Sequence, residues 1–329
     1  MKKTLAAVAV LGAFAGSALA ADVTLYGKVD GGINYQRLDV EVDTPDVKMS
    51  GDQDSFGFRS GQNSGSRWGL KGSEQISEGL TVGFQLENGF TVDDGKLGQG
   101  SRLFGREARV YAKTDFGTFH FGRMGGLDSG LGSVDVFGGK ASAFGTGWGD
   151  TVGANTDIFL GMSGRMDNTL TYESPAFAGM KVYAQVSLDP NSEDNNAVVG
   201  NGEGSHDVDR YYALGLSANY DALGLGLVVS TTDYKRDFAN EPWGADNSTV
   251  VSAFGSYDFG VAKVMLGAQY FDDVEYGSEI LTLSTGASTL VKGYGVMLGA
   301  TVPVSSGTLL PLSVITILNK LKTALLMAM

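Results

Sequence analysis

The residues that could carry out chemistry are few, and their spacing does not favour a catalytic or metal site. The chain has no cysteine and only two histidines, His120 and His206. A metal site needs clustered ligands, and an activated nucleophile needs a neighbouring base. The sequence also contains no G-x-S-x-G elbow and no Walker phosphate loop. We therefore expect no enzyme activity, no catalytic residue, no cofactor and no metal site, and interpret both histidines as ordinary polar positions.

Charge also limits the partners that can be expected. Asp and Glu number 37 against 24 Lys and Arg, so the formal net charge is -13. Affinity for nucleic acid rests largely on neutralising phosphates with basic side chains, so we expect no nucleic-acid partner. The acidic stretch 189–209 could bind divalent cations through carboxylate oxygens, or it could be a solvated loop. We favour the solvated loop.

The N-terminus has the features of an export signal. Lys2 and Lys3 precede an apolar stretch from Leu5 to Phe14, and the small-residue pattern Ala18-Leu19-Ala20 follows. This order predicts a bacterial signal peptide over residues 1–20 that is cleaved after Ala20. The alternative is an uncleaved membrane anchor. Between the signal and residue 309 no run of about 18 apolar residues occurs, which excludes membrane-spanning helices from that part of the chain.

Most of the chain alternates apolar and polar residues with a period of two. In residues 21–36 the odd positions are largely apolar and the even positions largely polar. Residues 80–87, 181–188, 223–229, 262–268 and 294–302 repeat the pattern, with Gly and Ser at many intervening positions. A period of two predicts β-strands with one apolar and one polar face.

The connections between these strands alternate between short turns and long polar stretches. The turn signals lie at 78–79, 115–117, 175–179, 221–224, 258–260 and 303–307, and the polar stretches at 38–66, 91–101, 124–156, 189–209, 235–247 and 272–289. This order is typical of an all-β, antiparallel up-and-down transmembrane β-barrel with tight periplasmic turns and long outer loops. About twelve strands can be counted to Val302, and a thirteenth begins at 308–310.

A barrel of this kind satisfies every backbone amide while its apolar face contacts lipid. Its polar face, with Lys28, Gln85, Glu87 and Lys181 among others, then needs water or polar partners inside. Many separated charges favour a water-filled lumen. The alternatives are a barrel enzyme, a closed-lumen surface adhesin or structural protein, and a secreted soluble β-protein.

Three segments carry a resemblance to a known family. They are Val23-Thr24-Leu25-Tyr26-Gly27-Lys28, Ser66-Arg67-Trp68-Gly69-Leu70-Lys71-Gly72 and Phe116-Gly117-Thr118-Phe119-His120-Phe121-Gly122-Arg123. In order and spacing they resemble the Gram-negative general porins, from the signal peptide to about Leu309. The resemblance implies a homotrimer of sixteen-stranded barrels in the outer membrane, in contact with its lipid. It also implies passive diffusion of ions and small hydrophilic solutes.

The resemblance further implies a charged constriction, in which the third long loop folds into the barrel opposite basic residues of the wall. The matching loop is 124–156, and its centre, Val134-Asp135-Val136-Phe137-Gly138-Gly139, resembles the family's acidic loop tip. The family places the acid directly before Phe, where this chain has Val136, so either Asp135 or Asp128 could take that role. The constriction residues implied by the resemblance are Lys28, Arg67, Arg106, Arg165, Asp128 and Asp135. The alternative is that the arginines only pair with loop carboxylates and hold the loop.

The last twenty residues do not continue the pattern. We assign the barrel to 21–309 and treat 310–329 as an atypical tail, because it lacks sustained alternation, turn signals and a terminal aromatic residue. Sixteen strands would need more chain than remains. Our hypothesis is an out-of-frame or truncated ending with the C-terminal strands missing; the alternative is a plug or an amphipathic surface helix.

Overall fold

The computed structural model describes residues 23–43, 48–61, 64–137, 164–192, 208–235, 246–276, 289–304 and 308–320. The predicted signal peptide lies outside these residues, as do positions 138–156 of the predicted constriction loop and 321–329 of the tail. Over the part of the chain that is described, no helix is long and apolar enough to cross a membrane.

The fold is all-β, as the alternation predicts. The strands are β1 (Thr24–Lys28), β2 (Gly31–Asp43), β3 (Lys48–Ser60), β4 (Arg67–Ser77), β5 (Leu80–Gly89), β6 (Glu107–Thr114), β7 (Gly117–Gly125), β8 (Arg165–Glu173), β9 (Met180–Ser187), β10 (Arg210–Tyr220), β11 (Leu223–Asp233), β12 (Thr249–Asp258), β13 (Lys263–Tyr276), β14 (Thr289–Val304) and β15 (Thr308–Lys320). Thirteen of them form one sheet in the order β1-β4-β5 and onward to β15, and β2 pairs with β3 in a separate hairpin. Every pairing is antiparallel and β4 to β15 follow chain order, so the predicted up-and-down arrangement is confirmed.

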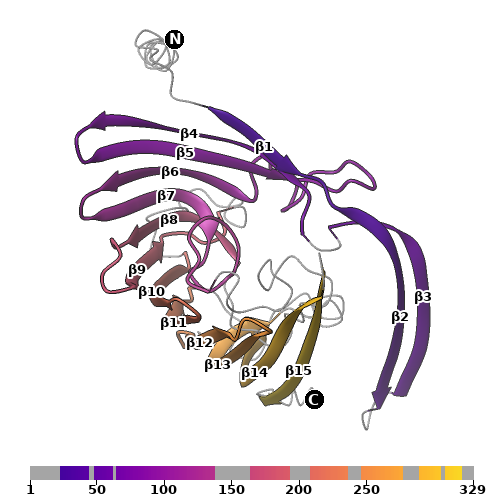
Figure 1. Cartoon of the computed structure of the whole chain (residues 1–329). Helices are drawn as coiled ribbons and strands as arrows, with labels where there is room; N and C mark the ends of the chain where they lie inside the picture. The colour runs from indigo at the N-terminus through magenta and orange to yellow at the C-terminus, as the bar shows by residue number, and fades with distance from the viewer. Residues whose placement is uncertain are drawn as a thin grey trace.

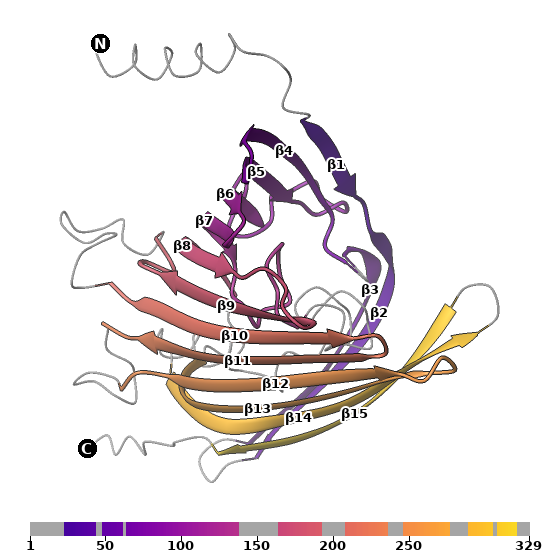
Figure 2. The same cartoon turned by 60° about the vertical axis from the view of Figure 1, so that its left-hand side comes forward.

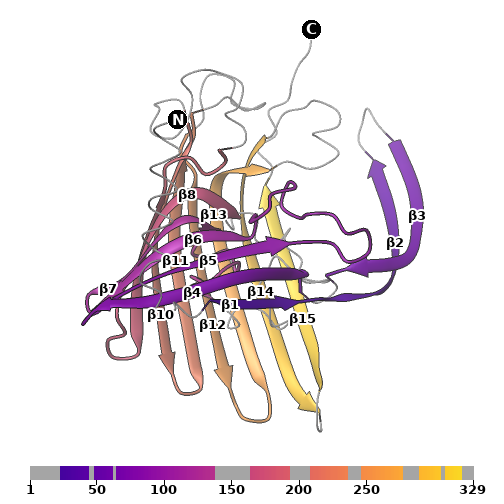
Figure 3. The same ribbon diagram turned by 90° about the horizontal axis from the view of Figure 1, so that it is seen from above.

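The sheet curls into an arc with β1 at one end and β15 at the other (Figures 1 and 2). Among the described residues β1 pairs only with β4 and β15 only with β14, so these strands are the two edges. The tight connections from β10 to β11 and from β12 to β13 lie at the same end of the molecule (Figure 3). The sheet therefore has a turn end and a loop end, as the sequence predicts.

A bend separates β1 from β2, and at the same level it separates β3 from β4. Only Val29 and Asp30 separate β1 from β2, and residues 61–66 separate β3 from β4. At the bend the hydroxyl of Ser66 donates to the carbonyl of Asp30 at 2.9 Å and accepts from the Asp30 amide at 3.0 Å. The β2–β3 hairpin beyond this point stands apart from the sheet (Figure 3).

The C-terminal part of the sheet extends further than the sequence pattern indicates. β15 pairs with β14 from Thr308 opposite Val304 to Lys320 opposite Lys292. Residues 310–320 of the atypical tail are thus in a strand, although their sequence does not alternate apolar and polar residues. Backbone pairing does not depend on alternation, so a strand can form there without the pattern. Whether the tail is in frame stays a hypothesis.

The two faces of the sheet differ in the way that a membrane barrel requires. On β10 and β11 the outward side chains Leu214, Leu216, Leu225 and Leu227 are exposed, whereas the alternate positions are buried. Exposed aromatic side chains gather near the turn end, at Phe116, Phe177, Tyr220, Tyr257 and Phe259. A continuous exposed apolar face is unusual for a soluble protein, and aromatic girdles are typical of the edges of a membrane barrel.

Candidate functional site

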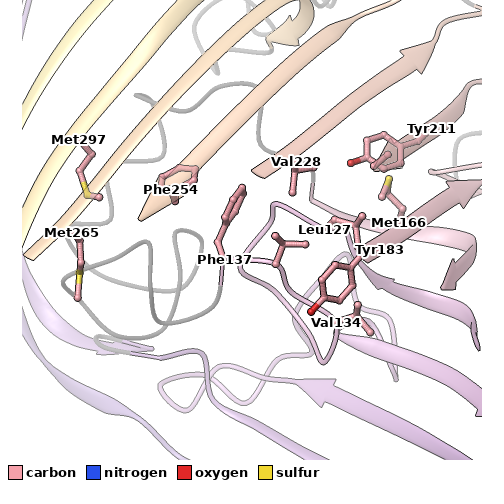
Figure 4. Close-up of a cluster of buried hydrophobic side chains, with 12 residues drawn as sticks. Leu127, Val134, Phe137, Met166, Tyr183, Tyr211, Val228, Phe254, Met265 and Met297 are labelled. Atoms are coloured by element: carbon pink, nitrogen blue, oxygen red, sulfur yellow. The ribbon is translucent and has the colours of Figure 1, made fainter. Parts of the chain in front are cut away.

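The segment 126–137, which follows β7, folds against the inner face of the sheet; we call it the inner loop. Leu127, Val134, Val136 and Phe137 from this loop are buried, and the Phe137 ring lies 4.4 Å from that of Phe254 on β12 (Figure 4). The amide of Val136 donates to the carbonyl of Leu127 at 3.0 Å, which folds the loop on itself. Apolar side chains hold the loop to the wall because this position removes them from water.

A polar contact fixes the inner loop on its other side. The hydroxyl of Ser133 lies 2.9 Å from Glu107 Oε2 on β6 and 2.9 Å from Gln85 Oε1 on β5. The inner loop therefore bridges two separate parts of the wall, with a polar anchor at β5 and β6 and an apolar anchor at β9 to β12.

Polar side chains form a continuous series along the inner face of β1, β5, β6, β7, β8 and β9, which we call the inner ladder. At its first end Tyr26 donates to Glu87 Oε2 at 3.0 Å, and Gln85 donates to the Tyr26 hydroxyl at 2.9 Å. Arg106 Nε donates to Glu87 Oε1 at 2.7 Å. The ladder here joins one carboxylate, one guanidinium and two neutral groups from β1, from β5 and from the residue that directly precedes β6.

The ladder continues with alternating charge. Arg109 Nε lies 2.5 Å from Glu107 Oε1, and its Nη1 is 2.5 Å from His120 Nδ1. His120 Nε2 is 3.8 Å from Glu173 Oε2, whose other oxygen accepts from Lys181 Nζ at 2.5 Å. Fixed opposite charges side by side create a strong local field on the inner face of the sheet.

A second cluster ties the loop end of the wall together. Asp167 at the start of β8 accepts from Arg102 Nη1 at 2.7 and 2.8 Å and from Arg123 Nη1 at 2.7 Å. The amide and hydroxyl of Ser192 donate to the same carboxylate at 3.2 and 2.8 Å. This Asp167 clamp connects the segment between β5 and β6 to β7, to β8 and to the segment after β9.

The structure places three of the predicted constriction residues, Lys28, Arg67 and Arg106, close to one another. Lys28 and Arg67 face each other in the register of β1 and β4, and Arg67 pairs on its other side with Gly89 of β5. Arg106 directly precedes β6 and is buried against Glu87. These positions lie next to the first end of the inner ladder.

The other three predicted residues have different surroundings. Asp128 is fully buried in the inner loop, and Asp135 Oδ1 accepts from the Phe137 amide at 3.0 Å, which shapes the loop tip. Arg165 is the first residue of β8 and lies opposite Gly125. The pairing of β7 with β8 shifts register between Gly122 and Met124, so strict alternation does not extend to Arg165.

Sequence reasoning missed the central ladder residues Glu107 and Arg109 and the Asp167 clamp. The alternation in β6 was the available signal: Val110 is exposed on the outer face, so Glu107 and Arg109 belong to the inner face. The structure places Arg106 directly before β6, so the alternation within that strand does not assign its face. His120, interpreted as an ordinary polar position, is buried between Arg109 and Glu173. The described part of the chain holds no group of three or more potential metal ligands.

Comparison with known proteins gives consistent matches. A family model for Gram-negative porins matches residues 6–310. An outer membrane porin protein of Bordetella pertussis is 35% identical over 314 residues, covering 90% of this chain and 77% of its own length. Outer membrane porin protein 32 of Delftia acidovorans is 30% identical over 306 residues, with 90% and 78% covered.

Solved structures with the same fold are also found. An anion-selective porin from Comamonas acidovorans has a TM-score of 0.60 at 23% identity and covers 91% of this chain and 79% of its own. The trimer form of OmpT, an outer membrane protein of Vibrio cholerae, has a TM-score of 0.55 at 17% identity, with 91% and 78% covered. At these identities the structural likeness concerns the fold alone.

Proposed function

Because the chain belongs to the Gram-negative porin family, we propose that its two-faced sheet serves as the wall of a water-filled channel in the outer membrane. Ions and small hydrophilic solutes cross such a channel by passive diffusion. Proteins of this family are channels rather than enzymes; the absence of any catalytic activity in this chain stays a prediction.

The observation that carries the proposal is the contrast between the two faces. The outer face exposes leucine and valine, whereas the inner ladder holds two arginines, three glutamates, a lysine and a histidine. Charged groups are costly to place in hydrocarbon, and they are stabilised by water and by one another. An apolar outer face with a charged inner face therefore fits lipid outside and water inside.

We further propose that the inner loop and the neighbouring basic residues form the narrowest part of the channel. The proposed constriction residues are Lys28, Arg67, Arg106, Arg165, Asp128 and Asp135. The neighbouring positions of Lys28 and Arg67, and the anchoring of the inner loop at Ser133 and Phe137, support this proposal. Charges on opposing sides of a narrow lumen would orient polar solutes and disfavour apolar ones.

Three further proposals concern the assembled protein. We propose that residues 1–20 are a cleaved signal peptide, that the mature chain forms a homotrimer, and that the exposed apolar face contacts outer-membrane lipid. The trimer proposal is supported by family membership and by the fold shared with a trimeric outer membrane protein. The lipid proposal is supported by the aromatic residues near the turn end.

Single-channel recording tests the function directly. The chain would be purified from outer membranes and added to a planar lipid bilayer in potassium chloride. Stepwise conductance increases are expected, and grouping in threes would support the homotrimer. A chain that is folded and recovered from outer membranes, yet gives neither steps nor sugar uptake by proteoliposomes, would favour the closed-lumen alternative. Recovery in the soluble periplasmic or extracellular fraction would contradict the membrane assignment.

A further inference from the structure

We propose that Gly215 of β10 and Gly226 of β11 are positioning residues for the channel. Together they form a receptor on the inner wall for Val136 and Phe137, and so fix how far the inner loop projects into the lumen. The loop's position follows from the geometry alone. The consequence for channel width rests on the function proposed above.

The space above each glycine is filled by the loop. A Cβ atom added at Gly215 would lie 2.8 Å from Val136 Cγ2 and 3.3 Å from Leu127 Cδ1. A Cβ atom added at Gly226 would lie 2.6 and 2.9 Å from Cδ1 and Cε1 of Phe137. Carbon atoms in optimal contact are about 3.5–4.0 Å apart, so even alanine at either position requires the loop to move.

The backbone itself does not require glycine at these positions. Neither Gly215 nor Gly226 has a positive φ, and both lie inside regular antiparallel pairing, Gly215 opposite Val228 and Gly226 opposite Ser217. Glycine inside a strand weakens it and often marks a place where another part of the chain approaches closely. The close approach of the inner loop therefore explains why glycine occupies both positions.

The loop cannot easily adjust to a larger wall residue. The Phe137 ring is fully buried and lies 4.4 Å from the Phe254 ring, and Phe254 is directly opposite Gly226 in the sheet. The carbonyl of Val136 would be 3.3 Å from the same added Cβ. At its other side the loop is fixed by Ser133 to Glu107. Displacement at the glycines would therefore tilt the loop about its polar anchor.

Thiol labelling measures the loop position without relying on conduction. The chain has no cysteine, so Val134→Cys introduces one thiol at a buried loop position. This thiol should react with a methanethiosulfonate reagent much more slowly than one from Asp93→Cys, which is exposed in the segment after β5. Adding Gly226→Ala or Gly215→Ala should raise the Val134→Cys labelling rate by about tenfold or more.

Gly255→Ala is the matched control. Gly255 lies in the neighbouring strand β12, where an added Cβ would meet only the end of the flexible Leu225 side chain at 3.1 Å and a carbonyl at 3.6 Å. This variant makes the same chemical change without contacting the loop, and should leave the labelling rate unchanged. Far-UV circular dichroism and heat-dependent gel migration would establish that every variant is folded.

Conductance and rescue complete the test. Gly226→Ala should increase the single-channel conductance or its fluctuation. Adding Phe137→Leu to this variant should reverse much of the effect, because leucine lacks the ring edge that the new Cβ atom would contact. Equal labelling rates in the parent and both glycine variants, or an equal rise in Gly255→Ala, would overturn the proposal. A labelling response in a chain that never conducts would support the receptor and contradict the channel function.

Discussion

Replacing Asp167 by asparagine should loosen the loop end of the wall. The change preserves the size of the side chain but removes the negative charge that Arg102 and Arg123 share. It leaves two guanidinium groups close together without the carboxylate between them. The segment between β5 and β6 and the segment after β9 should both lose their common attachment, because Ser192 also donates to Asp167.

The size of the effect follows from burial. The Asp167 side chain is 8% exposed, and those of Arg102 and Arg123 are 17% and 16% exposed. Removing one partner from a buried ion pair costs about 3–5 kcal/mol, whereas fully exposed pairs contribute about 0–1 kcal/mol. Because the arginines retain some water, we expect a loss of about 2–3 kcal/mol. For a chain of 329 residues that corresponds to a fall in unfolding temperature of roughly 3–5 °C.

Thermal unfolding in detergent, followed by circular dichroism, measures this loss. Asp115→Asn is the control, because Asp115 is exposed in the tight turn between β6 and β7. A double-mutant cycle with Arg102→Gln tests whether the loss comes from the clamp, since the two changes should be far from additive. If Asp167→Asn lowers the unfolding temperature no more than Asp115→Asn does, or if the cycle is additive, the clamp does not couple these segments.

Three other predictions concern the lumen and an outer segment. Phe137→Ala removes a fully buried ring from the inner loop and should raise single-channel conductance while the sheet remains folded; unchanged conductance would contradict the anchoring role. Glu107→Gln removes the carboxylate beside Arg109, so the reversal potential in a salt gradient should shift toward anions, and a shift toward cations would refute this. Hydrogen bonds from Lys96 and Thr91 lower the pKa of Asp94 to about 2. These contacts should persist above pH 4 and weaken as the pH falls toward 2, which carbon NMR titration of the Asp94 carboxyl can measure; titration near 3.8 would contradict them.

Much of the sheet could be predicted because consecutive side chains of a strand point to opposite faces, so that apolar and polar residues alternate along the sequence. Leu214 and Leu216 point outward and Ala213 and Gly215 inward, as the period of two predicts for β10. The pattern was insufficient where backbone pairing alone maintains a strand. Residues 310–320 do not alternate, yet they extend β15 along β14. It was also insufficient at the shift between β7 and β8, where the face of Arg165 cannot be counted from Thr171.

The candidate site was predicted less completely than the sheet. The inner loop and the basic positions Lys28 and Arg67 came from the family resemblance, and the structure places these two basic residues opposite each other. The alternation of β6 could have assigned Arg109 to the inner face. Its partners could not be predicted, because His120 and Gln85 contact it only through the register of three adjacent strands.

In the regular strands the sequence by itself determined which side chains are exposed on the outer face and which face the interior, because that choice depends only on position along one strand. It also determined where turns and loops alternate. The tertiary structure alone decided which interior groups meet. Arg102 contacts Asp167, which is 65 residues away in the sequence, and Phe137 of the inner loop lies over Gly226 of β11. Such contacts depend on strand register, on the curvature of the sheet and on the path of the inner loop, and no local pattern of residues encodes these.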